Sequence, residues 1–184
     1  MVSSARYARI KTVGYKCAIF TVALFIIAVA QVSFFSKINL FGAPPDLLLA
    51  ALVAICIKND HTVASVCGIA SGFFYCSLGG DRYYLYLAFS FLCGYVLWIV
   101  AEHFFGKNYP AFLALATIAF GIKGAYNFLY SAMVGSSFTF FRTFGAIILP
   151  EFASSMVFCS LSYLIFSILS NLVNKNKKVI KEAR

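Results

Sequence analysis

The chain has 184 residues, of which 62% are hydrophobic and only 11% are charged, and its mean hydropathy is +0.88. A soluble domain has about a quarter of its residues charged, and a short chain cannot hide this much apolar surface inside one globule. The composition therefore excludes a soluble enzyme, a disordered tail and a secreted disulfide scaffold, and it predicts a protein whose solvent is lipid.

The formal net charge of +9 is concentrated at the two ends of the chain, which carry Arg6, Arg9, Lys11, Lys16, Lys175, Lys177, Lys178, Lys181 and Arg184. Basic residues that flank apolar segments are typical of cytoplasmic tails and are attracted to anionic lipid. We therefore expect tails 1–16 and 174–184 on the cytoplasmic side of a bilayer. A nucleic-acid partner is not expected, because the chain has no basic module with interleaved aromatic residues.

Apolar segments predict six transmembrane helices in a single domain, 1–184, and the fold class of an all-α polytopic bundle. In chain order they cover residues 17–35, 44–57, 62–78, 83–105, 109–133 and 145–173. The first also resembles a secretory signal, but its apolar sequence continues through Phe34 and Phe35, so we expect a retained helix. The second is short for a span of ~30 Å, which requires either shelter by neighbouring helices or a locally thinner bilayer. Six crossings return the chain to its starting side.

The second and fourth predicted helices carry distinctive patterns at their ends. Pro44-Pro45-Asp46 is typical of a helix start, with proline in the first turn and Asp46 at the positive end of the helix dipole. In the fourth segment, tyrosines at the start and Trp98 near the end indicate the two membrane interfaces. These early tyrosines are Tyr83, Tyr84 and Tyr86.

Small residues recur at every fourth position of the third helix. They are Ala64, Gly68, Gly72 and Cys76, with Gly80 at the exit. In lipid, a face of small residues lets two backbones approach closely. The register predicts a packing seam, and its occupant is either another helix of this chain or a partner.

Lys123 is the main exception to the apolar pattern, because a charge in the middle of a span is costly and marks a functional site by default. Asn127 lies one turn further along the same face. One interpretation is a polar cavity in the outer half of the bundle, where Lys123 pairs with Glu151 or Asp46. In the other, Gly121-Ile-Lys-Gly124 interrupts the helix, and Lys123 extends to the surface on its aliphatic stem.

No motif predicts a catalytic centre, a cofactor or a metal. The six cysteines include no C-x-x-C pair, so they are interpreted as small packing residues. Asp60-His61 and Glu102-His103 join an acid to a histidine, but adjacent helical residues point about 100° apart and do not chelate. Catalytic motifs such as G-x-S-x-G or H-E-x-x-H are missing from the sequence. We therefore expect a protein that is not an enzyme.

One stretch resembles the rod shape-determining protein MreD family: Pro44-Pro45-Asp46-Leu47-Leu48-Leu49, then Gly68-Ile-Ala-Ser-Gly72 and a turn at Ser77-Leu78-Gly79-Gly80. Chain length, basic termini and the late Leu149-Pro150 are similar too, although the distinctive motifs lie between Pro44 and Tyr86. The chain departs from the family at Cys76, where an aspartate is usual, and Asp81 follows five residues later.

The resemblance implies a non-catalytic membrane scaffold of the bacterial cell-elongation machinery, located in the cytoplasmic membrane. Its implied partners are the bitopic protein MreC, a peptidoglycan polymerase and transpeptidase and, indirectly, the MreB filament. The expected contact residues are the Pro45-Asp46 corner and the Gly68/Gly72 seam.

The resemblance also implies a six-helix arrangement related to the substrate-binding subunits of energy-coupling-factor vitamin transporters. The alternative function is therefore a vitamin-binding subunit of that kind. Those subunits dock through an A-x-x-x-A stripe in the first helix, whereas the alanines here are not spaced by four: Ala18, Ala23, Ala28 and Ala30. Lys123 and Asn127 keep this alternative open.

Overall fold

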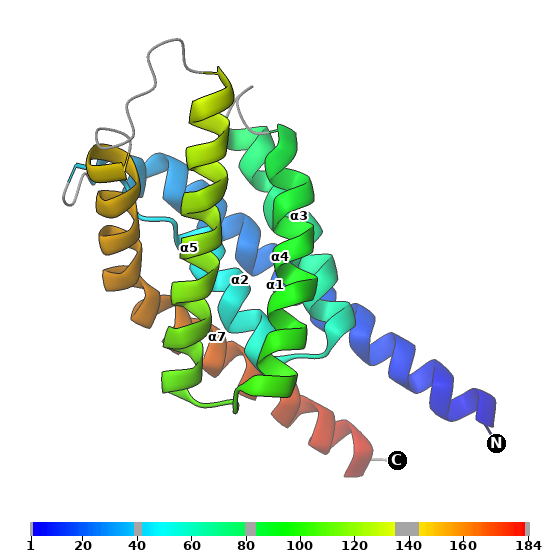
Figure 1. Cartoon of the computed structure of the whole chain (residues 1–184). Helices are drawn as coiled ribbons and strands as arrows, with labels where there is room; N and C mark the ends of the chain where they lie inside the picture. The colour runs from blue at the N-terminus through cyan, green and yellow to red at the C-terminus, as the bar shows by residue number, and fades with distance from the viewer. Residues whose placement is uncertain (1, 39–41, 80–83, 135–143, 183–184) are drawn as a thin grey trace.

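The computed structural model describes residues 2–38, 42–79, 84–134 and 144–182, and these are almost entirely helical (Figure 1). The elements are α1 (Val2–Ser33), the 3-10 turn η1 (Phe35–Lys37), α2 (Leu47–Lys58), α3 (His61–Gly79), α4 (Tyr84–Phe104), α5 (Tyr109–Val134), the π-helical turn η3 (Phe144–Ile148) and α7 (Leu149–Glu182). The predicted all-α polytopic bundle is confirmed.

Five helices are long and apolar enough to cross a membrane, namely α1, α3, α4, α5 and α7, so the chain has the makeup of a multi-pass membrane protein. By contrast, α2 has 12 residues and a length of about 18 Å, too short to cross ~30 Å of hydrocarbon. In Figure 1, α1 ends at the end of the bundle opposite to the start of α3, and α2 lies between them. Both chain termini lie at one end of the bundle.

The centre of the bundle is α2, whose residues Leu47 to Ile57 are all buried. It contacts α1, α3, α4, α5 and α7. A helix that is apolar on every side is stable only when it is surrounded, and five neighbours supply that surrounding. Shelter by these helices therefore explains how so short a helix lies inside the membrane.

Three predicted helices, 62–78, 83–105 and 109–133, agree with α3, α4 and α5 to within about one residue among the described positions. The predicted interruption in the fifth helix is wrong, because α5 runs through Gly121 and Gly124 without a break. Glycine lowers helix stability by only about 1 kcal/mol, which a packed membrane helix tolerates.

The predicted bounds of the other three helices are corrected. The first begins at Val2 rather than residue 17, and the last continues to Glu182 rather than ending at residue 173. Lysine, arginine and alanine are good helix formers, so the basic ends leave the apolar span without ending the helix. The second begins at Leu47, and its prolines precede the helix instead of lying in its first turn.

The small-residue seam of α3 is occupied by α4 of the same chain. A Cβ atom added at Gly68 would lie 2.8 Å from the backbone oxygen of Ser90, and one at Gly72 would lie 2.7 Å from the Cα atom of Leu87. A Cβ atom added at the opposing glycine, Gly94, would lie 2.8 Å from the backbone oxygen of Ala64. The seam is thus a helix contact within the chain. Cys76 is half-buried further along α3, and Gly80 lies outside the described residues.

Candidate functional site

Backbone at the entrance to α2 is non-helical although it lies inside the bundle. In lipid an unpaired backbone N–H costs several kcal/mol, and Pro44 and Pro45 have none to leave unpaired. Asp46 is the N-cap residue, and its Oδ1 atom accepts the N–H of Leu49 at 3.0 Å. The Pro-Pro-Asp sequence therefore suits a helix that begins within the membrane.

Two side chains from other helices accept two further backbone N–H groups at this corner. The N–H of Asp46 donates to Ser155 Oγ of α7 at 2.9 Å. The N–H of Leu48 donates to Gln31 Oε1 of α1, also at 2.9 Å. Pro45 and Asp46 are both buried in the chain's own interior, so this corner is a packing element and presents no surface to a partner.

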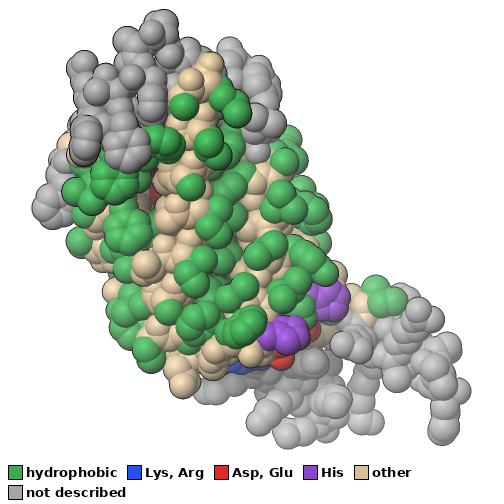
Figure 2. Space-filling model, in the orientation of Figure 1, with side chains coloured by type: hydrophobic (Ala, Val, Ile, Leu, Met, Phe, Trp, Pro, Cys, Tyr) green, Lys and Arg blue, Asp and Glu red, His purple; other side chains and the backbone are tan. Residues whose placement is uncertain are grey.

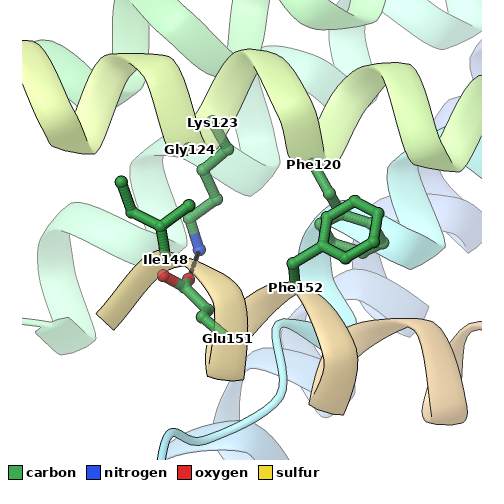
Figure 3. A pocket seen from close by; sticks show the side chains of 6 residues that line it. All are labelled: Phe120, Lys123, Gly124, Ile148, Glu151 and Phe152. Carbon is green, nitrogen blue, oxygen red and sulfur yellow. Dashed lines mark hydrogen bonds and ion pairs between the residues drawn. The ribbon is translucent and has the colours of Figure 1, made fainter. Parts of the chain in front are cut away.

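A buried charged cluster lies next to this corner. Lys123 of α5 is 3% exposed and forms ion pairs with Asp46 and with Glu151 in the first turn of α7. Figure 3 shows its ammonium group directed toward Glu151. The Nδ2 atom of Asn127 donates to Glu151 Oε2 at 3.2 Å. The structure thus pairs Lys123 with both of the acids named as alternatives, and the lysine does not extend to the membrane surface.

Two tyrosines complete the cluster. Tyr86 of α4 donates its hydroxyl to Asp46 Oδ2 at 3.2 Å, and Lys123 Nζ donates to the Tyr75 hydroxyl of α3 at 3.4 Å. The two rings stack with centroids 4.1 Å apart, and their centroids lie 5.4 and 5.7 Å from the ammonium nitrogen. At that distance an aromatic face attracts a cation.

Neither tyrosine was identified as a site residue from the sequence. Tyr86 was assigned to a membrane interface, but it is 2% exposed and lies in the interior. A tyrosine at the start of an apolar run is consistent with either position. The only sequence signal that could have placed it inside was the need of Lys123 and Asp46 for further hydrogen-bonding groups.

The electrostatics of the cluster are those of one cation shared by two carboxylates. The positive end of the α2 dipole lies at Asp46 and favours its negative charge. Side chains from α3, α4, α5 and α7 and from the N-cap of α2 take part. The cluster therefore links five helices at the entrance to α2. Each donor of the ammonium group has a partner among these side chains.

Little space remains beside the cluster. The cavity next to Lys123 has a volume of about 10 Å³ and is bounded by Phe120, Gly124, Ile148, Glu151 and Phe152 (Figure 3). This is the room of about one water molecule, whereas small-molecule sites have about 300–1,000 Å³. The residues predicted to line a polar cavity, Lys123, Asn127 and Glu151, do lie together, but their side chains occupy the space between them.

The two acid-histidine pairs lie apart from this cluster. The His61 ring lies 5.2 Å from the Trp98 ring, and His103 Nδ1 lies 2.9 Å from the backbone oxygen of Ile99. Figure 2 shows the histidines at the lower end of a flank covered by hydrophobic side chains. Across the part of the chain that the structure describes, no three His, Cys, Asp or Glu residues lie close enough together to hold a metal ion.

The fold and the site together define a helical, multi-pass membrane protein with a cluster of paired charges inside the bundle. Comparisons with known protein families, with curated proteins and with solved structures found no match to this chain.

Proposed function

We propose that this chain is a non-catalytic, MreD-like scaffold of the bacterial cell-elongation complex, located in the cytoplasmic membrane with both termini in the cytoplasm. The observation that carries the proposal is the Pro44-Pro45-Asp46 corner. The residues that resemble the family are also those that begin the central helix and bind Lys123. A motif with that role holds the central helix in place, and a rigid bundle suits a scaffold.

The distribution of polar groups supports a scaffold. Intramembrane charges are the usual carriers of transport or catalysis, and the three charges near the entrance to α2, Asp46, Lys123 and Glu151, are engaged with one another. The outer surface instead exposes large apolar side chains on most helices, as at Val22, Phe25 and Ile26 of α1, Phe91 and Leu92 of α4, and Leu161 and Leu164 of α7. Such faces suit contact with lipid and with the spans of other membrane proteins.

The partners proposed are an MreC-like bitopic protein and, through the same complex, a peptidoglycan polymerase and transpeptidase, with the MreB filament engaged indirectly. The vitamin-binding alternative draws its support from Lys123 and Asn127. Since the cavity beside Lys123 measures about 10 Å³, a vitamin has no room at that position, and the alternative gains nothing from this site.

The test is depletion of the chain in its native rod-shaped host, combined with affinity purification from the membrane. We expect rounded cells on depletion, and copurification of a bitopic MreC-like protein with the cell-wall synthases. Unchanged cell shape together with reduced uptake of a labelled vitamin would favour the alternative and overturn the proposal.

A further inference from the structure

A groove of about 280 Å³ lies between α1, α3 and the entrance to α2. Its walls are mostly apolar and include Ala28 and Val32 of α1 and Phe74 and Leu78 of α3. The residues that α1 and α3 contribute lie within the apolar spans Ile10–Lys37 and His61–Leu78, so the groove lies at the level of the membrane. An unfilled groove would forfeit dispersion contacts on both of its walls.

The size of the groove restricts what fills it. One turn of a helix about 10 Å across and 5.4 Å long occupies roughly 420 Å³, which is more than the groove of about 280 Å³ holds. A hydrocarbon chain one methylene wide fits between the side chains. Lipid acyl chains are also the molecules that already surround this face of a membrane protein.

One polar group lies in the wall of the groove. Gln31 uses its amide oxygen to accept the N–H of Leu48, while its amide nitrogen has no hydrogen bond to any residue in the described ranges. An amide donor in apolar surroundings is costly without an acceptor. A glycerolipid carries acceptors at the corresponding place, because its ester carbonyls join the acyl chains to the headgroup.

A basic residue is the sequence neighbour of one residue that lines the groove. Ser36 forms part of the wall, and the neighbouring Lys37 ends the apolar span that begins at Ile10. Lys37 is exposed and is absent from the ion pairs of the described residues. Lys37 follows Gln31 by six positions in the sequence, beyond the end of α1 at Ser33. A basic residue at the edge of a span attracts anionic lipid headgroups.

We propose that this groove binds one anionic glycerophospholipid. An acyl chain lies along Val32, Phe74 and Leu78. An ester carbonyl accepts a hydrogen bond from the amide N–H of Gln31, and the phosphate forms an ion pair with Lys37. The apolar wall, the amide donor of Gln31 and the exposed Lys37 match the three parts of such a lipid, which are its acyl chain, its ester and its phosphate.

The test is native mass spectrometry of the full chain after reconstitution into vesicles of equimolar phosphatidylglycerol and phosphatidylcholine. We expect one retained lipid per chain, with phosphatidylglycerol preferred. Lys37→Gln lowers that preference about fivefold, the contribution of one basic residue near a membrane surface. Lys107→Gln is the matched control and leaves the preference unchanged, since Lys107 is exposed in the connection between α4 and α5, which lies at the end of the bundle opposite to the end of α1 (Figure 1).

A second pair of variants tests the acyl-chain site. Val32→Trp fills the groove from a residue that is 45% exposed, and the retained lipid is lost; Val22→Trp, at a position 59% exposed on the same helix and outside the groove, keeps it. Leu78→Trp, from the opposite wall, replaces Val32→Trp if that variant does not fold. Equal retention of both lipids by the parent chain, retention that survives the tryptophan, or a retained molecule without a glycerol phosphate overturns the proposal.

Discussion

Lys123 joins parts of the chain that are far apart in sequence, since Asp46 lies 77 residues away and Glu151 lies 28 residues away. Removing water from such ions costs several kcal/mol each, and only good geometry with added hydrogen bonds compensates. The hydroxyls of Tyr75 and Tyr86 and the N–H of Leu49 supply those bonds. The cluster therefore fixes which helices meet, whatever its net contribution to stability.

Lys123→Met removes the charge but keeps a long, flexible side chain. We expect the free energy of unfolding to fall by about 3–5 kcal/mol, because the buried carboxylate of Asp46 loses its cation. Thermal unfolding in detergent, compared with Lys107→Met at an exposed position, measures the difference. A variant as stable as the parent chain contradicts this role for the ion pairs.

The triple variant Lys123→Met, Asp46→Asn, Glu151→Gln separates charge from shape. It removes all three charges together, and asparagine still offers an oxygen to cap α2. We expect it to recover most of the stability that Lys123→Met loses, because no unpaired charge stays buried. The same thermal measurement decides, and a triple variant less stable than Lys123→Met would show that the fold needs the charges themselves.

Ser155→Ala tests the backbone at the start of α2. Without the hydroxyl, the buried N–H of Asp46 has no acceptor, and we expect a loss of about 1–3 kcal/mol. Ser167→Ala is the control, because Ser167 is half-buried on the same helix. Equal unfolding temperatures for the two variants would mean that the Ser155 hydrogen bond contributes nothing.

Among the elements, α3 and α4 form the closest pair, and glycine makes that approach possible. Gly68→Ala and Gly72→Ala each place a Cβ atom within 3.0 Å of α4 backbone, so we expect each to destabilise by about 1–3 kcal/mol. Gly121→Ala has the opposite sign, a gain of up to about 1 kcal/mol from helix propensity, since nothing lies within 4 Å of its Cβ atom. Denaturant unfolding in micelles checks all three variants. Equal effects at the three positions contradict the seam.

The sequence predicted the ends of α3, α4 and α5 well because turn residues bound those apolar runs. It failed at the outer ends of α1 and α7, since hydropathy marks where a span ends in lipid and helix propensity continues beyond it. The sequence predicts the cluster around Lys123 only in part. Candidate partners could be named from charge, but the relative depth and rotation of the helices, which bring both acids and Tyr86 to one lysine, are set by tertiary packing.

At the scale of the whole molecule, the topology depends on whether the region of the 12-residue helix α2 crosses the membrane. Five helices are long enough to cross a membrane, and five crossings alone would leave the termini on opposite sides. The structure has both termini at one end of the bundle (Figure 1). This arrangement requires the region that ends with α2 to carry the chain across as well.

Reporter fusions distinguish the two topologies. With six passes and basic ends retained in the cytoplasm, green fluorescent protein is fluorescent at either terminus, and alkaline phosphatase is inactive at both. Phosphatase fused after Lys37, at the end of the α1 span, is the control and is active, because that point lies on the far side. Phosphatase activity at one terminus alone indicates five passes, which would mean that α2 enters and leaves by the same face of the membrane.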